Sequence, residues 1–324
     1  MRVLITGGSG FIGTNLIESL LQDGEEILNV DCRHPLNLEH NCCWRNTDIL
    51  DYDSIGNIFA EFRPTHVVHL AARTDIEEKT SIDGYAVNIQ GTENILKACA
   101  ATDFVERVII TSSMLVCRLG YLPQTDEDYS PPNLYGESKV LTEKITRDFG
   151  LACTWIIIRP TTIWGPWSER YRDEFFKVLR KGLYVHPAKK KILKTYGYVG
   201  NAVFQIRRLL VVPEAMVHKK TFYIGDPPID LLDWVNSFSM KLCAREVRII
   251  PVSAMHLLAF IGDVISKCGL RFPFTTFRLR NMTTENILDV ESTGNVTGKL
   301  PYSLEDGVDL TVKWLKNSQK GMNL

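Results

Sequence analysis

The chain has 324 residues, 45% of them hydrophobic, so it is long enough to bury a large core in one large or two modest domains. Its 37 basic and 38 acidic residues nearly cancel, which argues against nucleic acid as a partner and against a global field that attracts an anionic membrane. Its eight cysteines lack metal-ligand spacing, so we expect no metal site and a reducing compartment, with the cytoplasm as the default.

Two segments bear on export and on membranes. The sequence opens on Met1-Arg2 and passes directly into an apolar run, which leaves no room for a signal peptide. The most apolar stretch, residues 255–265, is interrupted by Gly262-Asp263 and is too short to span a bilayer. We therefore expect no membrane insertion.

A glycine-rich turn follows the first predicted strand, residues 2–6. Apolar residues then recur at helical spacing, so the turn opens a helix. Glycines let the backbone approach a pyrophosphate closely, and the free N–H groups of a helix N-terminus favour its negative charge. The turn is therefore predicted to bind a dinucleotide through Gly7, Gly10, Phe11, Ile12 and Gly13.

A second predicted strand, residues 26–31, ends in a carboxylate. Asp31 lies about twenty residues past the glycines, where an acid would accept the adenosine ribose hydroxyls. A carboxylate there repels a 2′-phosphate, which favours NAD over NADP as the cofactor. Arg33 favours the opposite choice, because a nearby arginine can hold such a phosphate.

Strand-like and helical segments alternate through the first half of the chain. Further strands are predicted at 66–70, 107–111 and 154–158, and helices at 51–62, 85–101 and 135–149. This order predicts an α/β fold with a doubly wound parallel (Rossmann) sheet, with ligands beyond the carboxyl ends of its strands. We assign residues 1–165 to this NAD-binding domain.

Prolines break the second half into shorter pieces. A strand is predicted at 221–224, and helices at 231–242, 254–267 and 304–316. We expect residues 166–324 to form mainly a smaller, mixed α/β substrate-binding lid, with segments near 195–225 returning to the large sheet.

A proton-transfer group is predicted on the helix at 135–149. Tyr135 and Lys139 are four residues apart and share one helix face. A nearby ammonium and a positive nicotinamide would lower the pKa of the tyrosine, so that it acts as a base. Ser113 follows a predicted strand end and could orient a substrate hydroxyl. Together these residues indicate redox chemistry on an alcohol carbon.

With these motifs in place, the sequence resembles the extended short-chain dehydrogenases/reductases, and within them the NAD-dependent nucleotide-sugar epimerase/dehydratase branch. The matching segments are Thr6-Gly7-Gly8-Ser9-Gly10-Phe11-Ile12-Gly13, Asp31, Asp48-Ile49, His69-Leu70-Ala71-Ala72, residues 88–94, Thr111-Ser112-Ser113, Tyr135 with Lys139, and Arg159-Pro160. The resemblance is strong in the N-terminal half and weak beyond it.

The resemblance implies roles for individual residues. It makes Ser113, Tyr135 and Lys139 the catalytic triad, with Lys139 also on the nicotinamide ribose. His69 is expected to be a packed strand residue rather than an acid or base. Further cofactor contacts are implied for Asp48, Ile49, Leu70, Ala71, Ala72, Asn88 and Pro160, and substrate contacts for Ser112, Thr162 and Lys194.

The sequence also departs from that branch. Met114-Leu115 stand where its dehydratases carry an Asp-Glu pair, so dehydration of that kind lacks its acid and base. Lys194 stands where many epimerases grip the diphosphate with an arginine, and lysine is a less geometrically exacting substitute. Residues 189–191 are three lysines, interpreted as a solvated loop rather than a diphosphate site. Trp164 and Trp167 could stack on a ligand or pack in the core.

Three functions are compatible with these features. The leading hypothesis is an NAD-dependent nucleotide-sugar epimerase, acting at C4, that works through a keto-sugar with Tyr135 as base. The second is a net dehydrogenase or reductase of a keto-sugar or of a 3β-hydroxysteroid-like alcohol, suggested by the apolar residues 251–279. The third is a non-catalytic NAD-binding regulator. By the resemblance a homodimer is expected, through the helices at 85–101 and 135–149, with Ile95, Leu96, Leu141 and Ile145 as candidate contacts.

Overall fold

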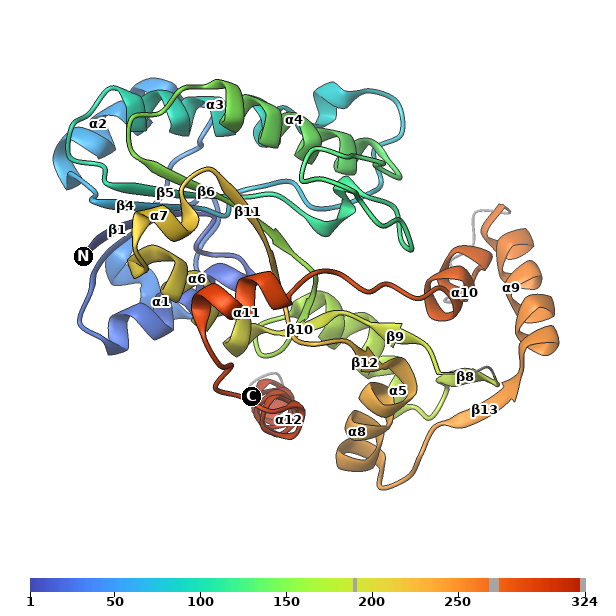
Figure 1. The fold of residues 1–324 in the computed structure, drawn as a ribbon. Helices are drawn as coiled ribbons and strands as arrows, with labels where there is room; N and C mark the ends of the chain where they lie inside the picture. Colours follow the sequence, from blue (N-terminus) through green and yellow to red (C-terminus); the bar gives the residue numbers. More distant parts are fainter. Residues whose placement is uncertain (189–190, 268–273, 321–324) are drawn as a thin grey trace.

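The structure is a computed structural model that describes residues 1–188, 191–267 and 274–320. Seven strands form one parallel sheet in the order β11-β6-β5-β4-β1-β2-β3 (Figure 1). They are β1 (Arg2–Thr6), β2 (Glu26–Val30), β3 (Trp44–Arg45), β4 (His66–His69), β5 (Arg107–Thr111), β6 (Thr154–Pro160) and β11 (Lys220–Ile224). The strand order reverses direction at β1, as in a doubly wound sheet, which confirms the predicted fold class.

Helices cover both faces of this sheet. The helices α2 (Tyr52–Phe62), α3 (Ala86–Ala100) and α4 (Leu134–Asp148) lie on one side, and α1 (Phe11–Gln22) and α6 (Val199–Val211) on the other (Figure 1). A hydrophobic core lies on each face of the sheet, and successive residues of a strand pack alternately into the two: Val3 and Ile5 into one, and Leu4 into the other. Because both faces are buried, the strands read as continuous apolar runs.

The start of α4 is fixed by local contacts. The side chain of Asn133 accepts a hydrogen bond from the backbone N–H of Gly136 at 2.9 Å and so caps the helix. A Cβ on Gly136 would lie 2.3 Å from the carbonyl oxygen of Leu115, so the helix packs directly on the loop after β5. This contact sets where the second residue of the helix, Tyr135, emerges.

The rest of the chain builds a smaller mixed region beside the sheet. Two-stranded pairs join β7 (Thr162–Trp164) to β10 (Tyr196–Tyr198), β9 (Leu193–Lys194) to β12 (Ile229–Asp230), and β8 (Val185–Ala188) to β13 (Arg248–Pro251). Its helical segments are a π-helix (Tyr171–Phe176), α5 (Lys177–Arg180), α8 (Leu231–Cys243), α9 (Val252–Lys267), α10 (Thr276–Thr283) and α12 (Leu304–Lys320). The helices α7 (Glu214–Val217) and α11 (Glu291–Thr297) belong to the large domain, because α7 contacts β6 and α11 contacts α6 and β11. Short 3-10 turns complete the chain at Leu38–Cys43, Ile82–Tyr85 and Met114–Val116.

Aromatic packing holds this smaller region together. Trp164 is 1% exposed and contacts the rings of Tyr198, Trp234 and Phe238 at centroid distances of 5.1, 5.9 and 5.3 Å. Trp167 lies 6.3 Å from the ring of Trp314. Of the two roles considered for Trp164, the structure supports packing in the core, because aromatic side chains of the protein surround its ring.

Several second-half segments rejoin the sheet. β11 pairs with β6 at the edge, and α6 packs against α1 on one face (Figure 1). The sequence predicted the strand but not the helix α6, nor β3, α10 and α11. Of the three-lysine run, residues 189–190 lie outside the described residues, and Lys191 is exposed. Among the residues that the structure describes, no helix combines the length and the apolar character needed to cross a membrane.

Candidate active site

The glycine turn lies between the ends of β1 and β4. Gly7 has φ +72°, and a Cβ there would lie 2.5 Å from the backbone nitrogen of Ala71, so only glycine fits without strain. A Cβ on Gly13 would lie 2.5 Å from the Cα of Gly8, which keeps α1 close to the turn. Gly10 precedes the first turn of α1, and no side chain among the described residues caps it. The turn thus leaves helix N–H groups for an anionic ligand.

Asp31 closes this turn from the end of β2. Its carboxylate is 7% exposed and accepts the backbone N–H of Ser9 at 3.1 Å and that of Arg33 at 2.9 Å. The Arg33 side chain is 73% exposed, and its guanidinium lies 3.8 Å from where a Gly10 Cβ would be. The acid is therefore fixed by the backbone, whereas the arginine lies over the turn from the solvent side.

Asp48 and Ile49, two of the predicted cofactor contacts, lie in the loop before α2. Asp48 accepts the N–H of Leu50 at 2.9 Å, and the carbonyl of Ile49 accepts a hydrogen bond from the Asn94 side chain at 2.9 Å. Ile49 is 4% exposed and packs so closely on Gly91 of α3 that a Cβ there would lie 2.4 Å from its Cδ1. This residue therefore anchors the loop in the core.

Ser113, Tyr135 and Lys139 meet beyond the end of β5. Ser113 and Tyr135 share a side-chain hydrogen bond, and the Ser113 Oγ also accepts the N–H of Leu115 at 3.1 Å. Lys139 lies one turn further along α4 and donates from Nζ to the carbonyl oxygen of Thr111 at 2.9 Å. Ser113, Tyr135 and Lys139 are all buried, with exposed fractions of 8%, 7% and 2%. The structure thus brings the predicted triad together at the edge where the glycine turn lies.

The charges of this triad respond mainly to burial. Burial raises the pKa of Tyr135, and the hydrogen bond from Ser113 lowers it by less. Burial also lowers the pKa of Lys139 to about 8, against an opposing effect of Glu143. The lowered tyrosine pKa predicted from the sequence includes the charge of a bound nicotinamide, so it stays a prediction; in the chain alone, burial outweighs the effect of Ser113.

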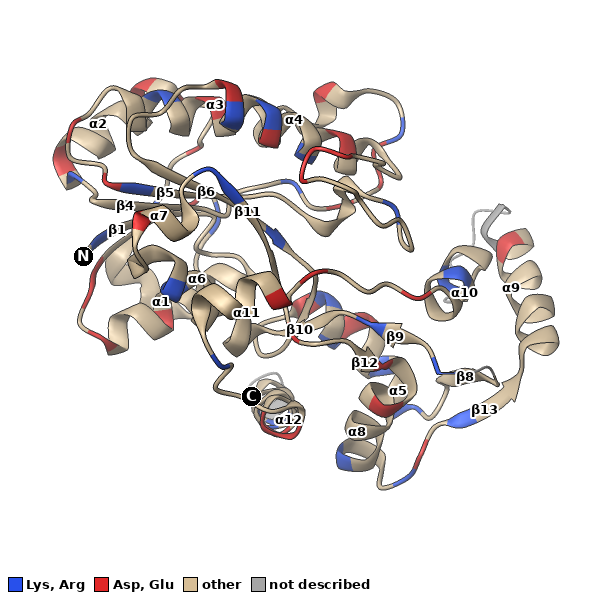
Figure 2. Ribbon diagram, viewed as in Figure 1, with Lys and Arg blue, Asp and Glu red and all other residues tan. Residues whose placement is uncertain are grey.

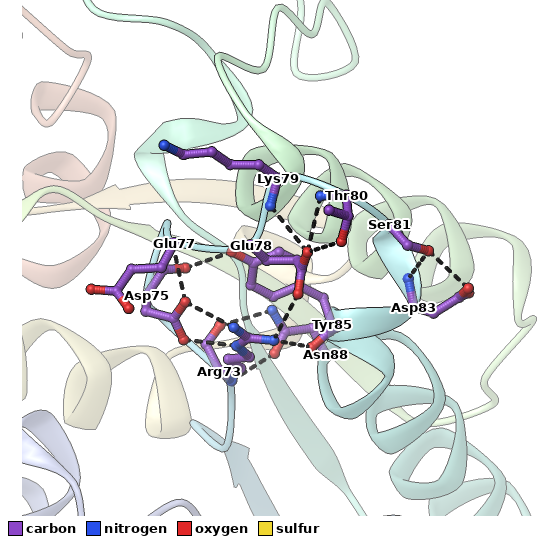
Figure 3. Close-up of polar contacts among 11 residues, drawn as sticks. Arg73, Asp75, Glu77, Glu78, Lys79, Thr80, Ser81, Asp83, Tyr85 and Asn88 are labelled. Atoms are coloured by element: carbon purple, nitrogen blue, oxygen red, sulfur yellow. Dashed lines mark hydrogen bonds and ion pairs between the residues drawn. The ribbon is translucent and has the colours of Figure 1, made fainter. Parts of the chain in front are cut away.

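The loop between β4 and α3 is held in place by polar contacts of Arg73 (Figure 3). The Arg73 guanidinium pairs with Asp75 at 2.7 Å and Glu78 at 3.7 Å, and lies 5.0 Å from the centroid of the Tyr85 ring. Tyr85 is fully buried, with its ring 6.0 Å from that of Tyr135. The sequence prediction did not include Arg73 or Tyr85, because their partners are set by the path of the loop.

Asn88 fixes the same loop from the first turn of α3. Its side chain accepts the N–H of Arg73 at 2.7 Å and donates to the Arg73 carbonyl at 3.0 Å and to Ser138 at 2.9 Å (Figure 3). The Asn88 amide is fully buried, and its polar atoms form hydrogen bonds within the protein itself. The structure therefore gives Asn88 a positioning role between the loop and α4.

Two predicted polar residues face the protein interior. Ser112 donates to Glu143 Oε1 at 2.6 Å rather than pointing to a ligand, a difference from the predicted substrate contact. His69 bridges the hydroxyls of Thr6 at 2.7 Å and Thr92 at 3.0 Å, and burial lowers its pKa to about 3. His69 is thus the packed strand residue that was expected.

Thr162 and Lys194, the remaining predicted substrate contacts, lie in strands β7 and β9. Thr162 Oγ1 lies 3.8 Å from the sulfur of Met114, and Pro160 ends β6 two residues before Thr162. Asn286 also reaches the Met114 sulfur, at 3.9 Å. Lys194, 3% exposed, donates to the carbonyl oxygens of Asn281 (2.7 Å) and Thr284, so its ammonium binds the chain itself. The predicted diphosphate grip is therefore not preformed at this lysine.

One family, described as the NAD dependent epimerase/dehydratase family, matches residues 3–225. The chain belongs to this family. The match includes the glycine turn, the triad and the edge strand β11, and it ends before the region from α8 to α12.

Individual relatives within this family differ in their reactions. An Escherichia coli O157:H7 protein, N-acetyl-alpha-D-glucosaminyl-diphospho-ditrans,octacis-undecaprenol 4-epimerase, is 29% identical, with 97% of this chain and 95% of the relative covered. A Vibrio cholerae UDP-glucose 4-epimerase is 31% identical over 56% of this chain and 57% of its own length. A Mycobacterium tuberculosis 3 beta-hydroxysteroid dehydrogenase/Delta 5-->4-isomerase is 29% identical, with 76% and 70% covered.

Solved structures share the fold over almost the whole chain. A UDP-glucose 4-epimerase from Thermotoga maritima with UDP-glucose has a TM-score of 0.74 at 21% identity, covering 98% of this chain and all of the other. The Thermus thermophilus enzyme in complex with NAD has a TM-score of 0.72 at 21% identity, with the same coverage. The second, smaller region is therefore arranged as part of the same overall fold.

Proposed function

We propose that the protein is an NAD-dependent 4-epimerase of a sugar carried on a diphosphate. The observation that carries this proposal is the buried triad of Ser113, Tyr135 and Lys139 beside the glycine turn, next to Met114 where a dehydratase has its acid. Proton transfer to and from a hydroxyl is available there, whereas the acid–base pair for eliminating water is missing from that place. The 4-epimerase relatives support the choice of carbon.

The residues present fit NAD. The turn at Gly7 and Gly10 offers backbone N–H groups for the pyrophosphate, and Asp31 offers a fixed carboxylate for the adenosine ribose. Lys139, held by the Thr111 carbonyl, lies where it can also bind the nicotinamide ribose. Bound NAD would supply a reversible hydride acceptor and the positive charge that the protein chain alone does not provide.

The triad's part of the reaction is proton transfer. Ser113 would hold the sugar C4 hydroxyl by a hydrogen bond, so that the hydroxyl proton points to the Tyr135 oxygen. The ionised Tyr135 would take that proton and return it to the same oxygen once the sugar has presented its other face. Lys139 would stabilise the phenolate by its charge, which requires its ammonium form.

The carrier of the sugar divides the proposal into two cases. The relatives named above act on a nucleotide-linked and on an undecaprenyl-diphosphate-linked sugar. The diphosphate is the chemistry that both share, and Lys194 could reach it only by giving up its two carbonyl partners. A net 3β-hydroxysteroid dehydrogenase is the second candidate, supported by the mycobacterial relative.

The compartment and assembly follow from the same proposal. We place the enzyme in the cytoplasm, where NAD is available and where its cysteines, seven of which are described as free, stay reduced. A homodimer through α3 and α4 remains part of the proposal, but its contact differs from the predicted one. Ile95 and Leu96 are fully buried in the chain's own core, and Leu141 is 36% exposed. Light scattering over a range of concentrations tests the dimer.

The reaction is tested with NAD well below the substrate concentration. Purified protein is incubated with UDP-glucose, UDP-N-acetylglucosamine and N-acetylglucosaminyl-diphospho-undecaprenol, and products are followed by NMR or chromatography. Conversion to the C4 epimer well beyond the NAD supplied is the expected result. Conversion that stops when NAD is consumed, or conversion of a 3β-hydroxysteroid alone, would replace the proposal by the dehydrogenase.

A matched pair of variants ties the conversion to Tyr135. Tyr135→Phe keeps the ring but removes the proton-transfer group, so kcat should fall about 10²- to 10⁴-fold while NAD binding is retained. Tyr52→Phe removes a hydroxyl from a side chain that is 41% exposed on α2 and should leave the rate unchanged. Equal rates for the two variants would show that the phenol does not carry the proton.

A further inference from the structure

Helix α9 (Val252–Lys267) has an exposed apolar face. Leu257, Phe260, Ile261 and Val264 are 63%, 64%, 43% and 46% exposed. Their spacing, i, i+3, i+4 and i+7, places them along one side of the helix. We call these four residues the α9 patch. Large apolar side chains gathered in this way mark a surface that binds something.

The other side of α9 is already used for packing. Met255 and Ala259 are fully buried in a small apolar cluster. That cluster is completed by Leu279, with Val185, Ile250, Phe274 and Met282 packed against it. The helix is therefore anchored to the protein by one face, and the α9 patch is the face left over. Residues on neighbouring elements extend its apolar character: Phe277 of α10 is 60% exposed and Ile249 of β13 is 55% exposed.

The patch stands at the far end of the molecule from the sheet. In Figure 1 the helices α9 and α10 lie beyond β8 and β13, well away from α1 to α4. The catalytic triad is carried by β5 and α4, so the patch is not part of the site already described. On α9, the carboxylate of Asp263 accepts the N–H of Thr276 at 3.2 Å and is thereby tied to α10.

The segment around α9, residues 247–284, is basic, whereas the chain as a whole is slightly acidic. Residues 247–284 contain five basic side chains and one acidic one, a net charge of +4, whereas the whole chain has −1, so the remaining residues carry −5. Arg248 and Arg280 are exposed, and Arg278 pairs with Glu174 at 3.0 Å. Figure 2 shows the mostly uncharged helix α9 beside the basic residues of α10 and β13. The apolar patch is thus embedded in a basic segment of an otherwise acidic protein.

We propose that the α9 patch docks on the surface of an anionic lipid bilayer. An apolar helix face flanked by arginines is the combination that binds the interface between headgroups and acyl chains. At 16 residues α9 is about 24 Å long, which suits a helix lying in the interface but not one crossing about 30 Å of hydrocarbon. Self-association would bring two segments of +4 together, so charge favours the bilayer over a second copy.

Surface docking would complement the proposed reaction without depending on it. A helix held at the interface keeps the Rossmann domain at the membrane, where lipid-linked diphosphate sugars reside. Binding to vesicles is measured without any sugar or NAD, so its failure and the failure of the epimerase proposal are separate results.

The test is sedimentation of the full-length protein with vesicles. Phosphatidylcholine vesicles are compared with phosphatidylcholine–phosphatidylglycerol vesicles at low and high salt. We expect the protein to sediment with the anionic vesicles, with binding reduced at high salt because the basic residues contribute. The double variant Leu257→Ser/Phe260→Ser should weaken this binding at least tenfold, and Arg248→Glu/Arg280→Glu should remove its dependence on anionic lipid.

Matched controls keep the test specific. Leu38→Ser replaces a side chain that is 72% exposed outside the patch, and Lys144→Glu reverses an exposed charge on α4, so both should bind vesicles as the wild type does. Circular dichroism and thermal unfolding check that each variant is folded. The proposal is overturned by no binding to anionic vesicles, by equal losses in the controls, or by a dimer that Phe260→Ser dissociates while vesicle binding is missing.

Discussion

Arg159 at the end of β6 and Glu143 on α4 form a two-point ion pair inside the protein. Nε donates to Oε1 and Nη2 to Oε2, both at 2.8 Å, and the side chains are 1% and 0% exposed. Glu143 lies one helical turn after Lys139 and raises its pKa against the effect of burial. Ser112 and Tyr129 complete the hydrogen bonds to the carboxylate at 2.6 and 3.0 Å. The ion pair thus joins the catalytic helix to the sheet.

Glu143→Gln is expected to weaken both the fold and the triad. It leaves the Arg159 guanidinium buried without its counter-charge, which should lower the free energy of unfolding by about 3–5 kcal/mol. It also removes the charge that raises the pKa of Lys139, so the basic limb of the kcat/KM profile should move to lower pH. Urea unfolding and pH–rate profiles measure the two effects. Glu137→Gln, on the exposed side of α4, is the matched control and should change neither.

Lys139 is expected to make stability depend on pH. Burial lowers its pKa from 10.5 to about 8, so between these values the unfolded chain binds more protons than the folded one. The free energy of unfolding should therefore rise with pH across this window, by about 3 kcal/mol from this group, and be lowest below it. In Lys139→Met this rise should be missing. Lys144→Met, on the exposed side of the same helix, should retain it; parallel curves for wild type and Lys139→Met would refute the assignment.

Apolar strands and glycines were predictable from the sequence because their signals are local. β1, β4 and β5 read as apolar runs, and the turn at Gly7 needs no distant partner to be recognised. Helix α6 was missed because it follows β10 directly, with Tyr198 at its N-cap and no side-chain cap among the described residues. Nothing local distinguishes that start from a continuing strand.

Contacts between distant residues account for the remaining differences. Ser112 bonds to a carboxylate 31 residues away, and Lys194 to carbonyls 87 and 90 residues away, so neither partner is visible in a local pattern. The burial of Tyr135 has the same origin. The lysine four residues on is part of the sequence pattern, whereas the burial that raises the tyrosine pKa comes from the packing of α4 on the loop after β5.

Asp31 is expected to set cofactor affinity. Its carboxylate is held by the N–H groups of Ser9 and Arg33, so Asp31→Asn keeps the size but weakens the acceptor for a ribose hydroxyl. Loss of a charged hydrogen bond should reduce NAD affinity about 10- to 100-fold. Titration calorimetry with NAD and NADP measures this. Arg33→Ala is the companion variant: NAD affinity should be retained, and an equal loss in both variants would show that the arginine, not the acid, binds the cofactor.

The conformation of Gly7 gives a prediction about stability with a built-in control. Gly7→Ala places a Cβ 2.5 Å from the Ala71 nitrogen at φ +72°, so the free energy of unfolding should fall by more than about 1 kcal/mol, and NAD binding should weaken with it. Gly56 lies inside α2, where no described atom lies within 4 Å of a Cβ, so Gly56→Ala should stabilise the protein by about 0.5–1 kcal/mol. Urea unfolding of both variants, with and without NAD, separates the two effects. Similar changes in both would mean that the turn tolerates a side chain and does not hold the cofactor closely.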